Sequence, residues 1–270
     1  MKANTAIGIA GAFVILGLAV ILEGGNPAAF INIPAFLIVV GGTAMATLAS
    51  TSMESVKRIP TLYKKAIGGS TLEPDVAAKQ MIALAEKARR EGLLALENDL
   101  EEIEDAFTRK GIQLVVDGAD SDLISGVLSA ETNAMASRHH ENAHVFTLAG
   151  GFAPTLGILG TVMSLVHVLE NLDKPSTLGH SIAGAFLATL FGVGSANLVF
   201  LPVANRLKEL TREELLYRDM LHEAVLAIQA GDNPRMLAEK LETFVPPEAR
   251  GRDKESAAPA PAPGEHLEAA

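Results

Sequence analysis

Two apolar segments in the second half of the chain decide its fold. They read GGFAPTLGILGTVMSLVHVL over residues 150–169 and STLGHSIAGAFLATLFGVGSANLVFLPVANRLK over residues 176–208. Neither contains an aspartate or a glutamate, yet both contain a proline, hydroxyl side chains and many small residues. Small residues let membrane helices approach closely, so we expect both segments to pack against other helices and to line a site.

Four blocks of the sequence lack Asp, Glu, Lys and Arg over the length of a membrane span. They cover residues 5–22, 33–52, 145–169 and 175–205. Each is long enough to cross a hydrocarbon core of about 30 Å as a helix. The first block has no clear small-x-small cleavage site, which favours a membrane anchor over a cleaved signal peptide. The blocks predict an all-α integral membrane protein with four transmembrane helices and a helical cytoplasmic insert between spans two and three.

Basic residues next to the spans predict the orientation. The loop over residues 23–32 has no Lys or Arg, whereas both the second and the fourth span are followed by several. These are Lys57, Arg58, Lys64 and Lys65 after the second span, and Arg206, Lys208 and Arg212 after the fourth. By the positive-inside rule, both termini and the long middle region lie in the cytoplasm.

This topology divides the chain into five parts. Residues 1–52 form spans one and two, 53–144 a cytoplasmic helical region, and 145–205 spans three and four. Residues 206–245 form a cytoplasmic helical tail, and the Pro- and Ala-rich residues 246–270 are predicted to be disordered.

Local signals place helices in the cytoplasmic parts. A helix is expected to begin at Pro74 and to be interrupted at Gly92, after which its apolar stripe resumes from Leu93 to Phe107. A third helical pattern, over residues 122–144, runs without a break signal into span three. After span four the pattern stays helical over residues 207–228, and a short last helix follows Asp232.

Small residues, prolines and threonines mark the apolar segments as more than anchors. Small residues recur every four positions in spans two, three and four, which fits packing within the chain but favours oligomerisation or a partner helix. Pro154 and Pro202 favour kinks, either as static bends or as hinges beside an ion path. The hydroxyls of Thr161 and Thr189 either bond a carbonyl four residues back or offer oxygens to a cation or to a partner's carboxylate.

The lack of acidic residues in the spans limits what the chain does alone. A cation path across a bilayer needs an ionisable group at depth in almost every case. The chain therefore either conducts nothing or takes the acid from another protein. The absence of cysteine excludes disulfides, thiol catalysis and thiolate metal sites.

One motif suggests a different function. His140, Glu141 and His144 match H-E-x-x-H, the pattern of zinc metalloproteases, and lie at the border of span three. No convincing third ligand follows, and such a short pattern arises often by chance in a polar helix. We keep an intramembrane metalloprotease as an alternative, but we predict no enzyme, no metal site, no cofactor and no nucleic-acid partner.

Several motifs together resemble the MotA/PomA family of flagellar motor stator subunits. The resemblance covers about residues 1–240 and includes the four-span layout. The motifs are Ala153-Pro-Thr-Leu-Gly-Ile-Leu-Gly160, the Asn171-Leu-Asp-Lys-Pro-Ser loop, Ala185-Phe-Leu-Ala-Thr189 with Gly192, and Pro202-Val-Ala-Asn-Arg-Leu-Lys208. It implies a homo-oligomer in the bacterial cytoplasmic (inner) membrane, with five subunits around two copies of a single-span, peptidoglycan-binding MotB or PomB partner. That partner carries the ion-binding aspartate, and ion flow past it turns the ring against the rotor protein FliG.

The resemblance also implies roles for single residues. Pro154 and Pro202 correspond to the prolines that couple ion flow to conformational change, and Thr189 to the threonine that faces the partner's aspartate. Arg89 and Glu97 look like the charges that contact FliG; Arg90 is a rival for the first role, and Glu131 is a further acid in the pattern.

The sequence does not decide which ion is transported, nor does it exclude related classes of protein. The position of Thr161 tends to be threonine in sodium-driven members of the family and alanine in proton-driven ones, so it leans towards sodium without deciding between H⁺ and Na⁺. The alternatives to a stator are an ExbB/TolQ-like energiser, which usually has three spans and an outside N-terminus, and a passive scaffold.

Overall fold

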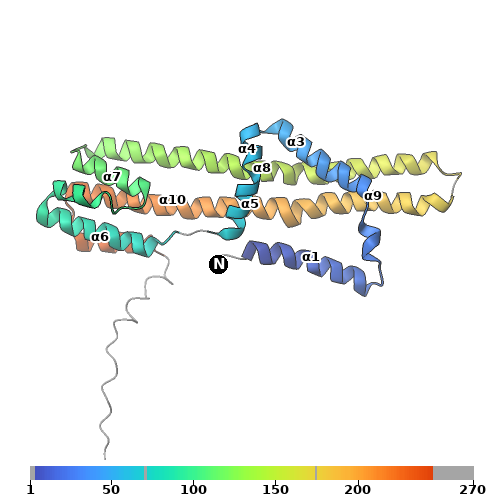
Figure 1. The fold of residues 1–270 in the computed structure, drawn as a ribbon, viewed down its shortest axis with the longest axis horizontal. Coiled ribbons are helices and arrows are strands. Elements are labelled where there is room, and N and C mark those ends of the chain that lie inside the picture. The colour runs from blue at the N-terminus through green and yellow to red at the C-terminus, as the bar shows by residue number, and fades with distance from the viewer. Residues whose placement is uncertain (1–3, 70–71, 174, 246–270) are drawn as a thin grey trace, which may run out of the picture. The chain divides into compact units, whose positions relative to one another are not determined.

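The computed structural model describes residues 4–69, 72–173 and 175–245, and every regular element within these residues is helical (Figure 1). The predicted tail over residues 246–270 lies outside the described residues. In chain order the elements are α1 (Asn4–Leu22), η1 (Pro27–Phe30), α2 (Ile33–Phe36), η2 (Leu37–Gly41), α3 (Gly42–Ser50), α4 (Met53–Lys57), α5 (Ile59–Gly68), α6 (Pro74–Glu91), η3 (Leu93–Asp99), α7 (Ala106–Val116), α8 (Ser121–Glu170), α9 (Pro175–Ser195), η4 (Ala196–Phe200), α10 (Leu201–Ala230) and α11 (Pro234–Glu242).

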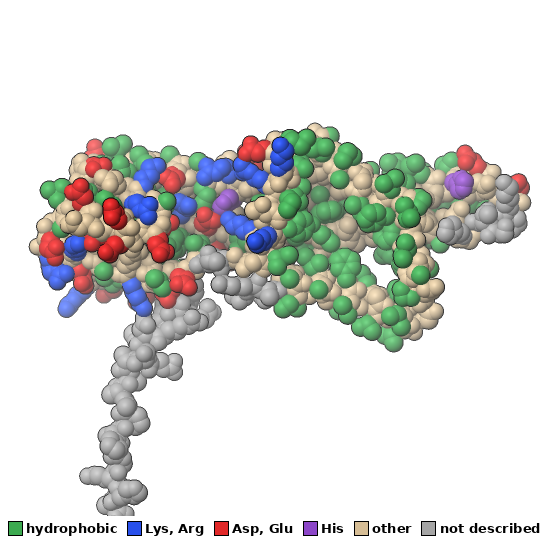
Figure 2. Space-filling model, viewed as in Figure 1, with side chains coloured by type: hydrophobic (Ala, Val, Ile, Leu, Met, Phe, Trp, Pro, Cys, Tyr) green, Lys and Arg blue, Asp and Glu red, His purple; other side chains and the backbone are tan. Residues whose placement is uncertain are grey.

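Four of the described helical stretches are long and apolar enough to cross a membrane. They are Thr5–Leu22, Ile33–Ser50 and apolar windows within Ser121–Glu170 and Ser181–Ala230. Each coincides with one of the four blocks that the sequence predicts. In Figure 2, hydrophobic side chains cover the surface of α1, α3 and α9, whereas acidic and basic side chains gather over α6 and α7. The division between apolar and charged parts is therefore visible on the surface of the protein.

The chain folds into two compact units, each made from two separate stretches of sequence. Among the described residues, one unit comprises residues 4–69, 133–173 and 175–215, and the other comprises residues 72–132 and 216–245. We call them the apolar unit and the charged unit. The long helices α8 and α10 each contribute residues to both units, so the predicted run from residues 122–144 into span three is confirmed.

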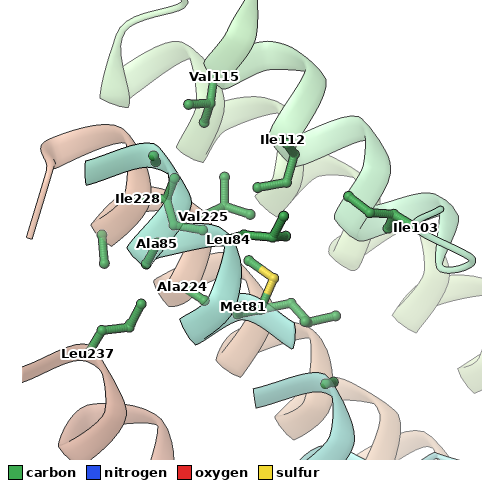
Figure 3. Close-up of a cluster of buried hydrophobic side chains, with 14 of the residues drawn as sticks. Met81, Leu84, Ala85, Ile103, Ile112, Val115, Ala224, Val225, Ile228 and Leu237 are labelled. Carbon is green, nitrogen blue, oxygen red and sulfur yellow. The ribbon is translucent and has the colours of Figure 1, made fainter. Parts of the chain in front are cut away.

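The charged unit has a hydrophobic core to which the insert and the C-terminal helices both contribute. Met81, Leu84 and Ala85 of α6 lie against Val225 of α10 and its neighbours (Figure 3). The core also holds residues of α7, α8 and α11, among them Ile112, Leu128 and Leu237. The insert and the C-terminal helical region, which the sequence analysis treats as separate parts, therefore share one interior.

The local helix signals in the charged unit are right at both ends of α6 and wrong for the stripe that follows it. The helix begins at Pro74 and ends at Gly92, whose φ of +89° lies in the left-handed region that favours glycine. The stripe from Leu93 to Phe107 is not one continuous helix, because η3 ends at Asp99 and α7 begins after it. Asp105 starts that new helix, since its side chain accepts a hydrogen bond from the Thr108 amide.

The apolar unit has two smaller clusters of buried side chains. In one, Tyr63 of α5 packs edge to face against Phe146 of α8, with ring centroids 5.0 Å apart. Burial raises the pKa of Tyr63, so its hydroxyl stays neutral. In the other, Phe191 of α9 packs against a cluster that includes the fully buried Val39. The exposed Phe36 meets the Phe191 ring edge to face at 6.4 Å. These contacts join α5 to α8, and α2 and η2 to α9.

Shortening a core side chain of the charged unit should destabilise it far more than shortening a surface one on the same helix. Leu128 is 0% exposed and Leu123 is 53% exposed, both on α8. We expect Leu128→Ala to lower the free energy of unfolding of this unit by about 2–5 kcal/mol, because it leaves a cavity. Leu123→Ala is the matched control and should change it by less than about 1 kcal/mol. Denaturant titration of the purified chain measures both, and equal effects would contradict the assignment of the core.

Candidate functional site

The helices α8 and α9 meet backbone to backbone at two glycines. A Cβ atom on Gly157 would lie 2.9 Å from the carbonyl oxygen of Ala188 and 3.2 Å from the Cα of Gly192. A Cβ atom on Gly192 would lie 2.5 Å from the carbonyl oxygen of Ala153. Only glycine fits such an approach. The small residues of spans three and four, which the sequence attributes chiefly to a partner helix, are thus used for packing within the chain.

This close approach brings the two predicted site threonines together. Thr161 of α8 and Thr189 of α9 share a hydrogen bond between their hydroxyls. Thr161 Oγ1 also lies 3.0 Å from the carbonyl oxygens of Gly157 and Ala185. A hydroxyl carries one hydrogen, so Thr161 donates to one carbonyl at a time and can accept the hydrogen of Thr189. The expected bond to the carbonyl four residues back is present, and the pair across the helices adds a second.

Pro154 lies inside α8, close to the same contact. A proline at this position cannot donate a hydrogen bond to the carbonyl of Gly150, so one rung of the helical ladder is missing. At Gly150 the helix also touches α10, because a Cβ atom there would lie 2.6 Å from Leu201 Cδ2. The weakened turn of α8 therefore lies between its contacts with α9 and α10.

Pro202 follows an irregular turn. The segment η4 is a π-helix, and the amide of Leu201 donates to the carbonyl of Ala196, five residues earlier. Pro202, the second residue of α10, adds another missing donor. The Asn197 side chain donates to the Val193 carbonyl at 2.9 Å, which supplies a partner in this disturbed stretch. π-Bulges inside α-helices occur frequently at functional sites. A second π-helical segment, η2, lies between α2 and α3.

The predicted rotor-contact residues Arg89, Arg90 and Glu97 lie before and after Gly92, the residue at which α6 gives way to η3. Arg89 and Arg90 are in the last turn of α6 and Glu97 is in η3, and all three are exposed. None of them takes part in an ion pair with another described residue, so their charges are available to a partner. Leu94, between them, is 72% exposed and adds an apolar side chain to this charged surface.

Glu131, the fourth residue of that prediction, has a different environment. Its carboxylate accepts a hydrogen bond from Lys110 Nζ at 2.8 Å and lies 4.0 Å from an Arg218 nitrogen. The Arg218 guanidinium carbon in turn lies 4.6 Å from the centre of the Phe107 ring. Glu131 thus links α7, α8 and α10 inside the charged unit, in contrast to the exposed Arg89 and Glu97.

The H-E-x-x-H pattern does not assemble a metal centre. The rings of His140 and His144 stack with centroids 6.2 Å apart, and both side chains and Glu141 are exposed on α8. Among the described residues, no group of three or more His, Cys, Asp or Glu side chains could hold a metal ion. The protease alternative therefore gains nothing from the structure.

Some residues of interest have no clear sequence signal. Lys110 and Arg218 look like ordinary surface charges in the sequence, because their common partner Glu131 is distant along the chain. Thr43 and Thr47 of α3 are buried, and neither hydroxyl oxygen has a hydrogen-bond partner among the described residues. Their spacing of one helical turn is a signal that could have been read, since it places two hydroxyls on one face of span two.

Comparison with known proteins agrees with this arrangement. Residues 99–220 match the MotA/TolQ/ExbB proton channel family. The chain is 35% identical over 254 residues to Motility protein A of Bacillus subtilis, which covers 93% of both chains. It is 35% identical over 245 residues to the chemotaxis protein PomA of Vibrio alginolyticus, covering 91% of this chain and 96% of that one.

Solved structures are similar over the same length. One is the structure of C. jejuni MotAB, with a TM-score of 0.87 and 33% identity, covering 92% of this chain and 97% of that one. Another is the flagellar MotAB stator complex from Bacillus subtilis, with a TM-score of 0.85 and 36% identity, covering 92% and 98%. The fold and these matches define the class as a helical membrane protein of motor stators. The chain belongs to the MotA/TolQ/ExbB family, in the group that includes Motility protein A and PomA.

The glycine contact predicts which helix substitutions the apolar unit tolerates. Gly192→Ala places a methyl group against the Ala153 carbonyl, so α8 and α9 must separate at the threonine pair. We expect a destabilisation of about 1–3 kcal/mol and a lower melting temperature of the purified chain. Gly194→Ala is the matched control, because a Cβ atom there has no neighbour within 4 Å. Identical melting curves for the two variants would contradict the contact.

Proposed function

We propose that the chain is a flagellar motor stator subunit that forms a cation channel with a MotB- or PomB-type partner and couples ion flow to rotation. The observation that carries the proposal is the hydroxyl pair of Thr161 and Thr189 between two apolar segments that contain no Asp or Glu. The likeness to MotAB stator complexes supports it. The function is mechanical and requires neither catalysis nor a cofactor.

The proposed topology has four membrane crossings in the bacterial inner membrane, with both termini and the charged unit in the cytoplasm. The four apolar helices are long enough for it. Lys and Arg after the second and fourth spans support the orientation through the positive-inside rule. In this arrangement the parts over residues 53–144 and 206–245 are cytoplasmic, and residues 1–52 and 145–205 lie in the membrane.

The ion path forms at the surface between this chain and its partner. Threonine oxygens can replace part of the hydration shell of a cation, but a fixed negative charge at depth is also needed. The partner's aspartate supplies that charge, since the spans of this chain have none. The transported ion is H⁺ or Na⁺, and the hydroxyl of Thr161 favours Na⁺. Pro154 and Pro202 each remove a backbone donor, from α8 and α10, on the same side of the threonine pair, and suit a coupling role.

Torque is passed on by the charged unit. In the proposed assembly, five copies surround two partner subunits, and Arg89, Arg90 and Glu97 contact the rotor protein FliG. Their exposure and their freedom from ion pairs support this role. Glu131 is a further acid of the proposed rotor contact, and its carboxylate is paired with Lys110 and Arg218.

Motility in a strain that lacks its own stators tests the function and the ion together. The full-length chain and its partner are expressed there, and swimming speed is measured against external sodium at fixed pH, with and without a protonophore. We expect restored swimming that depends on sodium and is indifferent to the protonophore. Arrest by the protonophore without sodium dependence would identify H⁺ as the ion. No swimming despite normal membrane levels of both proteins would contradict the function.

Reversing an exposed charge should reduce torque without affecting the fold. Arg89→Glu changes a side chain that makes no ion pair with any described residue, so membrane levels should stay normal while motor torque falls at least about two-fold. A reversed charge on the rotor protein should restore part of it. Arg235→Glu, an equal charge change at an exposed position of α11, is the control. Normal torque in Arg89→Glu would count against the contact.

A further inference from the structure

An ion pair closes the turn that carries the exposed charges. Lys87 of α6 donates a hydrogen bond from Nζ to Asp99 Oδ1 at 2.7 Å, and the two side chains are 27% and 23% exposed. Lys87 lies two residues before Arg89, and Asp99 lies two residues after Glu97. The pair therefore joins the two arms of the turn around Gly92, just inside the residues that face outward.

A second basic side chain holds the chain that leaves this turn. The guanidinium of Arg109 on α7 donates from Nε to the carbonyl oxygens of Leu100 at 3.1 Å and Ile103 at 3.0 Å. Residues 100–105 lie between η3 and α7, where the backbone has no regular helix to accept its hydrogen bonds. Arg109 thus takes the place of missing backbone donors.

Apolar anchors fix the inner face of the same segment. Leu96 and Ile103 are almost fully buried in the core of the charged unit, while Leu94 and Glu97 point outward. A 3₁₀-helix has poorer hydrogen-bond geometry than an α-helix, so η3 has little rigidity of its own. Its rigidity must come from these anchors and from the two basic side chains.

We propose that Lys87, Asp99 and Arg109 are positioning residues that lock η3 onto α6 and α7, so that force applied at Arg89, Arg90 and Glu97 reaches the core of the charged unit. This inference rests on the proposed rotor contact. If the turn deforms under load, less of the force applied at its surface is transmitted to the core. The ion pair keeps the spacing between Arg89 and Arg90 on α6 and Glu97 on η3 constant.

The protonation of Lys87 makes the pair permanent. The hydrogen bond with Asp99 raises the pKa of Lys87 above its ordinary value, and the charge of Asp99 acts in the same direction. The ammonium group therefore stays charged at every physiological pH.

Three variants and a control test the proposal in the full-length chain, purified with its partner. Lys87→Met and Asp99→Asn each remove one charge, and Lys87→Arg keeps it. Glu101→Gln removes a charge from an exposed residue two positions beyond Asp99 and is the control. Hydrogen exchange of the amides over residues 92–100 reports the rigidity of the turn without any motor. Torque per stator at high load, measured with equal numbers of fluorescently counted stators, reports the transmission of force.

We expect Lys87→Met and Asp99→Asn to speed exchange in the turn about two- to five-fold and to lower torque per stator, with exchange elsewhere unchanged. Lys87→Arg and Glu101→Gln should match the unmodified chain in both measurements. Unchanged exchange in the charge-removing variants would overturn the proposal, as would faster exchange with full torque. Lower torque that a reversed charge on the rotor restores, without faster exchange, would instead make Lys87 or Asp99 a contact residue. The exchange measurement stands even if the chain drives no motor, so failure of the proposed function is seen separately.

Discussion

The contact between the backbones of α8 and α9 at Gly157 and Gly192 is the constraint on which the membrane part depends. Two helices can approach this closely only where neither has a side chain, and the lipid interior gives them no hydrophobic reason to do so. One turn away on each helix, the same approach places the hydroxyls of Thr161 and Thr189 within hydrogen-bond reach. The site is therefore a consequence of packing, because neither threonine has a partner from the other helix without it.

In the charged unit, the exposed charges lie at a turn that is only partly α-helical, so other contacts have to hold that turn in place. The core of this unit comes from segments far apart in the sequence, and Lys110 and Arg218 pair with Glu131 nearer the surface, between α7, α8 and α10. These charges bind one another, whereas Arg89 and Glu97 stay exposed. A charge that is already paired within the unit, such as Glu131, stabilises the fold, whereas an exposed charge such as Arg89 is available to contact another protein.

Much of the fold can be predicted because the signals are local. The apolar blocks, the start of α6 at Pro74, its end at Gly92 and the unbroken α8 all follow from neighbouring residues. The stripe from Leu93 to Phe107 shows where that fails. Its apolar positions are buried as the pattern indicates, yet they lie in a 3₁₀-helix, an irregular segment and a new α-helix, because the core can bury the same spacing without one continuous helix.

The sequence by itself determined the class of protein, the apolar helices and the residues of the candidate site, since length, composition and motif spacing are properties of the chain alone. It also determined that the apolar blocks contain no acid, so that an acid in any ion path along them has to come from another protein. Only the tertiary structure decided that Thr161 meets Thr189, that Glu131 is held by two cations, and that Lys87 and Asp99 close the turn. These are contacts between positions distant in sequence, and local pattern carries no information on which partner each side chain meets.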